Sequence, residues 1–561
     1  MNKELIRAYA LKNAIEHEGK ANPKSVLNSL FAEGLKREDI DIVYPLVEEI
    51  VTEVNSSSSE KQKEDFEKLK SLIHQRKTRK EDELPELEGA IEGKVVMRIA
   101  PFPSGPLHIG NTRALILNSE FVKKYKGKFI LFFDDTIGSE DKQIVPEAYD
   151  LIKEGVEWLG IKPDEVYYKS DRFEIYYDYA DELIKKGYMY VCSCSQEEFQ
   201  RIKEKGIECA CRNLSPEKSY ERWKKMFSRT TKEGEFVVRL KTSMQDPDPA
   251  FRDRVMLKIA TRPHPRTKKK YKVYPSMEFS WAIDDYLIGT THVLRGIEHQ
   301  MSTKVQDFIR KIFNWPNPIS LYLGLFQIEG VKISKSKGAK EVKEGRYIGW
   351  NDPRLWSLQS LRDRGIKPEA IKKFIISQGL DRKNVKVPIE VLYSINRKML
   401  DECPRYFFIK EPVKIKIENA PNLKINIPIH PSKNLGFKNR DTFNEFFIEK
   451  KDYEEIKEGE EIRLMHLFNF RCYKISPNGK KEFIFSSQEP KSKIKIIHWI
   501  PSELETSKVK VLLEDGSLIE GIADPEVKNL NEQQQFQFER FGFVKIYKKE
   551  KEFLECWFTH R

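Results

Sequence analysis

The sequence predicts a multidomain protein with a Rossmann-like α/β domain at its centre, a small helical module before it and an all-β region after it. Its 561 residues are too many for one hydrophobic core. A strand–turn–helix–strand pattern begins near residue 95, and short alternating strands begin near residue 405. Among the latter, residues 509–522 are expected to form a hairpin around Asp515-Gly516. The composition, 39% hydrophobic and 33% charged, fits a globular protein. No apolar run approaches the roughly 20 residues that a membrane-spanning helix needs, so no membrane association is expected.

The first part of the chain, residues 1–90, is expected to be a helical module followed by a charged linker. Apolar residues recur at helical spacing up to about residue 54, and Asn22-Pro23 is typical of the start of a second helix. The serine run at 55–60 ends this pattern, and the charged stretch after it is either a linker or an exposed helix. No catalytic motif occurs here, so RNA docking, protein docking and a purely structural role all remain open.

The α/β domain opens with residues 95–111, VVMRIAPFPSGPLHIGN. Its apolar start indicates a buried strand, which leads into a turn rich in proline and glycine and then into a helix. Residues 128–133 return as a second strand that ends in Asp134-Asp135. Such a βαβ unit creates an anion site at the carboxyl ends of its strands. The segment has neither GxGxxG nor GxxxxGK[ST], which excludes the dinucleotide and P-loop interpretations.

A second motif stands about 220 residues downstream, VKISKSKG at 331–338. PSGPLHIGN resembles the HIGH signature of class I aminoacyl-tRNA synthetases, and the segment from Lys332 to Ser336 resembles their KMSKS signature. Either motif alone is weak, because a four-residue histidine motif arises by chance and a Lys/Ser run is usually a solvated loop. The two in this order, each on its expected turn, are a strong signal.

Other segments narrow the resemblance to the glutamyl and glutaminyl branch of that class, namely those at 158–192, 274–299 and 349–371. Ile497-His-Trp499 and FERFGF at 538–543 resemble the paired anticodon-binding barrels of the archaeal and eukaryotic enzymes, whereas the bacterial glutamyl type has a helical domain there. The resemblance implies a first catalytic half at 91–187, an inserted acceptor-binding subdomain at 188–272, a second catalytic half with the KISKS loop at 273–340, a helical stem-contact region at 341–404 and β-barrels at 405–561.

Charge and cysteine content add two expectations. A net charge of +12 favours a polyanionic partner, although the lysines are scattered over the whole chain. The N-terminus lacks a signal-peptide core, so the expected location is cytoplasmic, where a disulfide framework is not expected.

Two CxC pairs can place four thiolates around one structural Zn²⁺ ion, the alternative being four ordinary cysteines. Some relatives hold zinc at such a pattern and others have lost it; the four residues are Cys192, Cys194, Cys209 and Cys211.

In the reaction implied by the resemblance, L-glutamate attacks ATP to give glutamyl-adenylate and pyrophosphate. Glutamate is then transferred to the 3′ end of tRNA and AMP is released. The attacking carboxylate is already ionised, so catalysis consists of alignment and of stabilising charge on the phosphates. His108, Asn111, Lys332 and Lys335 are the implied catalytic residues, with ATP accompanied by Mg²⁺. Asn111 stands at the second His position of the signature, where it can donate a hydrogen bond but carries no charge. The implied ATP-binding residues are Pro101, Pro103, His108, Gly110, Asn111, Lys332, Ser334 and Lys335.

The amino-acid site follows from the same resemblance. Arg98 and Arg295 stand where the glutamyl branch places arginines that bind the side-chain carboxylate, a group that a guanidinium matches bidentately. Asp134 takes the acidic position that holds the α-amine, and Ser104 is assigned to the same site. The alternative for each is an ordinary surface or ion-pair residue.

Three positions depart from the family pattern. Phe132 replaces an arginine before the acidic pair, and Ile137 replaces an aspartate after Thr136. Met277 replaces a tyrosine that contacts the amino acid. A thioether is a poor hydrogen-bond acceptor and no donor, so glutamate recognition is expected to depend more on the two arginines.

Three alternatives to a glutamyl enzyme fit the sequence less well. A glutaminyl enzyme binds a neutral amide, which does not need paired arginines, and the short relative that modifies a tRNA base lacks an anticodon domain. A catalytically inactive tRNA-binding paralogue is disfavoured by intact His108, Gly110, Lys332 and Lys335. The expected partners are tRNA(Glu), with tRNA(Gln) left open as a further acceptor, and the family suggests a monomer.

Overall fold

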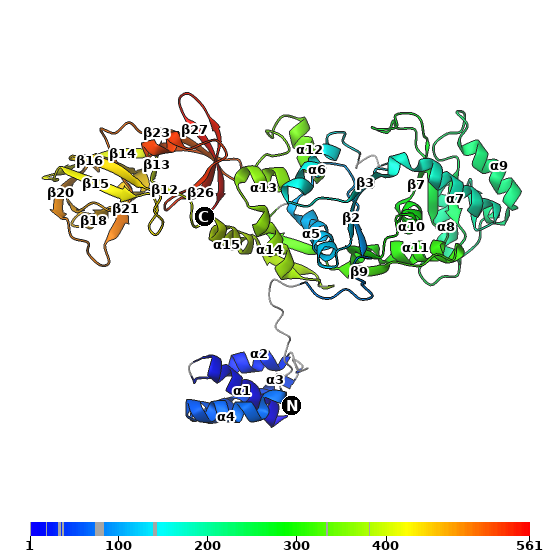
Figure 1. Ribbon diagram of the computed structural model, residues 1–561, viewed down its shortest axis with the longest axis horizontal. Coiled ribbons are helices and arrows are strands. Elements are labelled where there is room, and N and C mark those ends of the chain that lie inside the picture. Colours follow the sequence, from blue (N-terminus) through cyan, green and yellow to red (C-terminus); the bar gives the residue numbers. More distant parts are fainter. Residues whose placement is uncertain are drawn as a thin grey trace. The chain divides into compact units, whose positions relative to one another are not determined.

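The computed structural model describes residues 2–17, 19–31, 35, 39–72, 84–137, 143–331, 335–380 and 382–561. The chain forms two compact units, Met1–Glu83 and Leu84–Arg561 (Figure 1). No helix among the described residues is long and apolar enough to cross a membrane.

Among its described residues the N-terminal unit has the α-helices α1 (Lys3–Glu16), α2 (Pro23–Phe31), α3 (Ile40–Asn55) and α4 (Ser59–Leu69). Asn22 caps α2 as predicted, accepting from the backbone N–H of Lys24 at 2.9 Å. The charged stretch after the serine run is helical as far as residue 72. Helix α4 belongs to the bundle because its Phe66 and Leu69 pack against the core. Its Gln62 is 1% exposed and donates to the carbonyl of Val54 at 2.8 Å. The sequence predicted a linker or an exposed helix here, whereas α4 has an apolar side that packs in the bundle.

The second unit starts with three parallel strands, β1 (Val96–Ile99), β2 (Lys128–Phe133) and β3 (Glu165–Tyr168). Helix α5 (Ile109–Lys124) connects β1 to β2, and α6 (Ala148–Trp158) connects β2 to β3, which confirms the βαβ unit. The pair β8 (His292–Gly296) and β9 (Ile319–Leu323) is parallel and lies beside β1, where the Thr291 N–H donates to the Val96 carbonyl at 3.0 Å. Helices α10 (Met277–Leu287) and α11 (Gln300–Ile312) flank β8 in the chain.

Between β3 and α10 the chain forms an inserted subdomain, which has a small core of its own and shares a larger one with α10 and α11. It has an antiparallel sheet of β4 (Met189–Cys192), β5 (Val237–Leu240), β6 (Val255–Ile259) and β7 (Val273–Pro275). Its helices are α7 (Phe173–Lys185), α8 (Gln196–Lys205) and α9 (Pro216–Met226), and the 3-10 turns at 169–171 and 210–213 complete it.

A mostly helical segment follows the strand β10 (Phe326–Glu329). It contains α12 (Lys335–Lys343), α13 (Leu358–Arg364), α14 (Pro368–Gln378) and α15 (Ile389–Leu400), and β11 (Val385–Pro388) pairs in parallel with β10. Helices α13, α14 and α15 share the core of the β1–β3 sheet, with Phe374 and Leu392 fully buried.

The C-terminal region is all β apart from α16 (Lys450–Glu455) and a 3-10 turn at 525–529. Two seven-stranded sheets and a hairpin, β15–β16, account for it. One sheet has the order β21-β18-β19-β20-β14-β17-β22 and the other β12-β25-β26-β27-β23-β24-β13. The strands are β12 (Arg405–Tyr406), β13 (Phe408–Lys410), β14 (Pro412–Glu418), β15 (Leu423–Pro428), β16 (Phe437–Thr442), β17 (Glu445–Glu449), β18 (Glu461–Leu464), β19 (Asn469–Ile475), β20 (Lys481–Ser487), β21 (Lys495–Ile497), β22 (Ile500–Pro501), β23 (Ser507–Leu512), β24 (Leu518–Ala523), β25 (Gln535–Phe538), β26 (Gly542–Lys549) and β27 (Leu554–His560).

The hairpin predicted around Asp515-Gly516 is the β23–β24 hairpin. Its turn forms because Gly516 adopts φ +86° and the Asp515 carboxylate accepts from the Ser517 N–H at 2.8 Å. Aromatic side chains of this region are mostly core: Trp499 is 1% exposed and donates to the Met465 carbonyl at 2.8 Å.

Candidate active site

The turn between β1 and α5 is held by its own side chains. His108 is the N-cap of α5, and its Nδ1 accepts from the Gly110 N–H at 3.1 Å. Asn111 completes a capping box by accepting from the His108 N–H at 3.2 Å. A ring nitrogen that accepts carries no proton, so the proton of the neutral His108 ring lies on Nε2. That Nε2–H is a donor at the start of a helix, where the dipole also favours an anion.

The same turn is fixed by a segment about 250 residues away. The Ile109 N–H donates to the Trp356 carbonyl at 3.0 Å, and the Leu358 N–H donates to the Leu107 carbonyl at 2.9 Å. The start of α13 therefore pairs with the histidine turn as a short antiparallel bridge, His108 opposite Ser357. This explains why the helical segment that follows β10 belongs to the catalytic core.

The loop at 100–107, here called the proline loop, follows β1 and is hydrogen-bonded to the segment that follows β2. The Pro101 carbonyl accepts from the Asp134 N–H at 3.0 Å, and the Pro103 carbonyl accepts from the Val145 N–H at 2.9 Å. The Ser104 N–H donates to the Phe102 carbonyl at 2.9 Å. The proline loop and Asp134 thus lie together at the carboxyl edge of the parallel strands, the edge at which open α/β sheets bind ligands.

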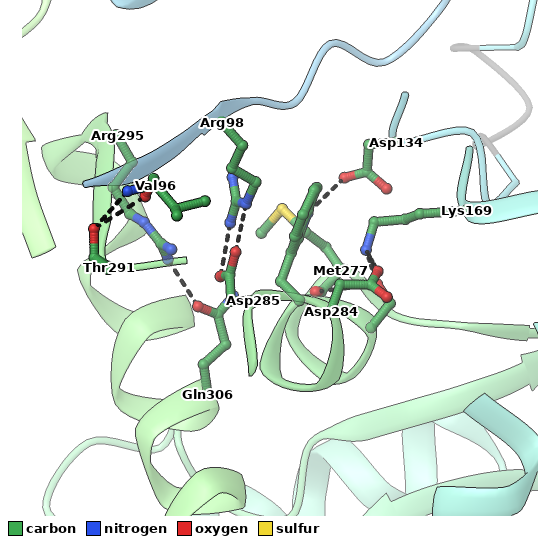
Figure 2. A network of polar contacts seen from close by, with 12 residues as sticks. Val96, Arg98, Asp134, Lys169, Met277, Asp284, Asp285, Thr291, Arg295 and Gln306 are labelled. Atoms are coloured by element: carbon green, nitrogen blue, oxygen red, sulfur yellow. Dashed lines mark hydrogen bonds and ion pairs between the residues drawn. The ribbon is translucent and has the colours of Figure 1, made fainter. Parts of the chain in front are cut away.

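Arg98 is part of a buried ion pair, the alternative that the sequence left open for it. Its Nε and Nη2 donate to the two carboxylate oxygens of Asp285 at 2.5 and 2.8 Å (Figure 2). Arg310 donates to the same carboxylate at 3.2 Å. Burial raises the pKa of Asp285, but the two arginines outweigh it and hold the pKa below its ordinary value. The Nη1 of Arg98 has no protein partner in the part of the chain that the structure describes.

Arg295 has a different environment. Its Nη1 donates to Gln306 Oε1 at 2.9 Å (Figure 2) and to Thr303 Oγ1 at 3.1 Å, both neutral acceptors. Among the described residues no carboxylate forms an ion pair with it, and its Nε and Nη2 have no protein partner. Burial and the nearby Arg98 charge lower the pKa of Arg295 to about 10. The nearby Asp285 carboxylate acts to raise the pKa of Arg295 but makes no ion pair with it. A half-buried cation without a direct counter-ion can receive an anionic ligand.

The remaining polar groups form a second cluster on α10. Asp134 accepts from the indole N–H of Trp281 at 3.1 Å. Lys169, fully buried, donates to Asp284 at 3.0 Å and to Ser280 at 2.7 Å (Figure 2). The structure thus brings Arg98, Asp134 and Arg295 into one region with groups that the sequence reasoning had missed. The pair of adjacent acids at 284–285, in a mostly apolar helix, was the sequence signal that could have pointed to these groups.

The three departures from the family pattern lie in apolar surroundings. Phe132 is fully buried and packs edge-on against Trp281, with ring centroids 4.9 Å apart. Met277 begins α10 and belongs to the same apolar cluster. Ile137 packs against the core of the inserted subdomain. In this chain all three side chains contribute to apolar packing.

A further buried carboxylate, Asp135, connects the sheet to the inserted subdomain. It accepts from the Ser170 N–H at 3.0 Å and from Tyr149 at 2.8 Å, and burial raises its pKa. The backbone carbonyl of Asp135 contacts Nε2 of His264 at 2.6 Å. The Nδ1 of His264 accepts backbone N–H groups, so Nε2 must be the donor. Sequence reasoning missed His264 because the three hydrogen-bond partners of its ring are all backbone groups.

The lysine signature is only partly described. Lys332 and Ser334 lie outside the described residues. Lys335 begins α12, and nothing is described of its side chain.

The four cysteines of the two CxC pairs come together in the inserted subdomain. Their sulfur atoms all lie within 4.8 Å of one another, and none is in a disulfide. A Zn–S bond of about 2.3 Å gives a tetrahedron with S···S edges of about 3.8 Å, so a small contraction accommodates the ion. Arg222 donates to the Cys211 sulfur at 3.3 Å, a contact that favours a thiolate. The donor set fits a closed, structural Zn²⁺ site.

The chain also matches family models along most of its length. Residues 94–402 match the catalytic domain of the class I (E and Q) tRNA synthetases, and residues 403–488 and 496–547 match their anti-codon binding domains. The chain belongs to this family. Its two catalytic signatures and its all-β C-terminal region accordingly have the order that the sequence predicted.

Relatives of this synthetase extend over the whole chain. A glutamate–tRNA ligase of Pyrococcus furiosus is 42% identical and covers 100% of this chain and 99% of its own length. A glutamate–tRNA ligase of Methanocaldococcus jannaschii is 41% identical, with 100% of both chains covered. The crystal structure of a glutamate–tRNA synthetase from Elizabethkingia anophelis is 22% identical, with a TM-score of 0.39 over 55% of this chain and 71% of the other. A likeness that low supports no inference about the site.

Proposed function

We propose that this protein is a glutamate–tRNA ligase, which activates L-glutamate with ATP to glutamyl-adenylate and transfers it to the 3′ end of tRNA(Glu). The environment of Arg295 supports glutamate as the substrate. Its half-buried guanidinium has neutral hydrogen-bond partners, and among the described residues its Nε and Nη2 donors have no protein partner. A glutamate side-chain carboxylate supplies the missing charge and accepts two hydrogen bonds from Nε and Nη2. A glutamine side chain would leave the cation uncompensated, which argues against the glutaminyl alternative.

The residues around Arg295 take complementary roles in this proposal. Asp134 binds the α-amine, Arg98 offers its remaining Nη1 to the substrate, and Ser104 lies at the same edge. His108 donates from Nε2 to phosphate oxygens of ATP, and Asn111 donates through its amide N–H₂, since its oxygen is used in the capping box.

For ATP we assign Pro101, Pro103 and Gly110 to the loop and turn that receive it, with Lys332, Ser334 and Lys335 reaching the pyrophosphate oxygens. Mg²⁺ bound to ATP lowers the cost of bringing the polyphosphate charge into the site. The carboxylate that attacks the α-phosphorus is already ionised, so the chain's contribution is alignment and charge stabilisation rather than a base.

The remaining regions bind tRNA in this proposal. The inserted subdomain at 188–272 receives the acceptor end, the helices at 341–404 contact the stem, and the sheets from residue 405 onward bind the anticodon loop by splaying its bases. The ligase would act as a cytoplasmic monomer, and tRNA(Gln) remains open as a second acceptor.

The four cysteines hold a structural Zn²⁺ ion in this proposal. Elemental analysis of purified protein should give about one zinc per chain. Cys192→Ser should lose the metal, whereas Cys472→Ser, at a buried cysteine outside the cluster, should retain it. Zinc-free wild-type protein purified from zinc-supplemented cells would contradict the assignment.

The function is tested by charging purified tRNA(Glu) and tRNA(Gln) with labelled glutamate in the presence of ATP and Mg²⁺. Charging of tRNA(Glu) is the expected result, and charging of both tRNAs would extend the acceptor range. Binding of tRNA without any charging would favour the inactive paralogue and overturn the proposal.

A further inference from the structure

The indole of Trp281 lies between two cations. The guanidinium carbon of Arg98 is 3.5 Å from the centre of the indole, and the ammonium nitrogen of Lys169 is 3.7 Å from it. The indole N–H donates to Asp134 at 3.1 Å, and the side chain is 3% exposed. The indole of Trp281 therefore makes two cation–π contacts, and its single hydrogen-bond donor is paired with Asp134.

The three contacts come from three neighbouring parallel strands. Arg98 belongs to β1, Asp134 directly follows β2, and Lys169 directly follows β3. The carboxyl ends of adjacent parallel strands meet at one edge of the sheet, which is where the substrate groups are proposed to bind. Trp281 therefore touches each strand end at this edge.

The helix that carries Trp281 also supplies the counter-ions. Asp284 and Asp285 follow it by three and four residues, a spacing that places all three side chains on one face of α10. Asp284 pairs with Lys169 and Asp285 pairs with Arg98. Each cation is thus fixed by a carboxylate and by the indole, while Asp134 is fixed by the indole N–H.

We propose that Trp281 is a positioning residue of the amino-acid site. It orients Asp134 toward the α-amine and holds Arg98 in place, and it does not itself contact the substrate. This inference rests on the proposed function, because it assigns Asp134 and Arg98 to opposite ends of a bound amino acid.

The test is Trp281→Phe, which keeps an aromatic ring between the two cations and removes the N–H that holds Asp134. Steady-state charging should show the KM for glutamate raised about tenfold, which is the effect of one lost hydrogen bond to a carboxylate. The kcat and the KM for ATP should stay within about twofold of wild type, because neither depends on the α-amine contact.

The matched control is Trp223→Phe in the inserted subdomain. Trp223 is 2% exposed and donates to Asp181 at 3.0 Å, so the substitution removes the same kind of hydrogen bond away from the site. Thermal unfolding of both variants measures the structural cost, and only Trp281→Phe should change the KM for glutamate.

Three outcomes separate the possibilities. A Trp281→Phe protein with wild-type KM for glutamate overturns the inference, as does one in which the KM values for glutamate and ATP rise together. Failure of the wild-type protein to charge any tRNA with glutamate overturns the proposed function instead.

Discussion

Asp285 is the charge on which the buried arginines depend, so Asp285→Asn is the sharpest perturbation of the catalytic core. The carboxylate is fully buried and takes two hydrogen bonds from Arg98 and one from Arg310. Asparagine keeps the shape but turns one acceptor into an N–H₂ group facing guanidinium donors. It leaves Arg98 without its carboxylate partner and leaves Arg310 with Asp307 alone, at 3.2 Å. Removing one partner of a buried ion pair costs about 3–5 kcal/mol.

Urea unfolding measures that loss. With a slope of about 3 kcal/mol per molar urea, the midpoint of the catalytic domain should fall by about 1–2 M. Asp150→Asn is the control, because Asp150 is 90% exposed and 3.9 Å from Lys153, and its midpoint should not move. A midpoint for Asp285→Asn within about 0.3 M of wild type would refute the reasoning.

The pH dependence has a defined sign. The pKa of Asp285 is lower in the folded protein than in the unfolded chain, so its contribution is fully present above the unfolded value of about 3.9 and is lost as pH falls through the still lower folded value. The stability difference between wild type and Asp285→Asn should therefore be constant from about pH 5 upward and should shrink below about pH 4. A difference that shrinks between pH 5 and pH 7 would contradict the assignment.

The remaining predictions concern other parts of the site. Arg295→Gln should lower kcat/KM for glutamate by about 100-fold or more in the charging assay, because a charged bidentate contact is lost, and an unchanged value would remove Arg295 from the site. His264→Leu should raise the KM for glutamate, since it releases the Asp135 carbonyl beside Asp134, and kinetics indistinguishable from wild type would contradict this. Gly105→Ala should slow charging and destabilise the proline loop, because Gly105 has φ +148° and an added Cβ would lie 3.2 Å from Trp350; unaltered kinetics and melting would show that the loop tolerates it.

Much of the fold was predictable because local signals agreed with the global arrangement. The strand at 96–99, the helix that begins after His108 and the strand at 128–133 each follow from apolar periodicity and capping residues. Two CxC pairs were enough to predict a four-sulfur cluster. Turn chemistry located the hairpin at 515–516.

The partners of the site residues were not predictable, because they depend on contacts between distant segments. Arg98 and Asp285 are 187 positions apart, and His108 and Ser357 are further apart still. A sequence shows that an arginine is present but not which acid approaches it. The indole of Trp281 likewise resembles any core aromatic until the ends of three strands are seen around it.

The measurement that tests the account most directly is the competition between glutamate and glutamine for charging of tRNA(Glu). The two amino acids differ only in the charge and donor groups of the side-chain end, so the ratio of their kcat/KM values reports what Arg295 recognises. The account predicts a ratio above about 1,000 in favour of glutamate, which falls sharply in Arg295→Gln. A wild-type enzyme that charges glutamine as well as glutamate would contradict it.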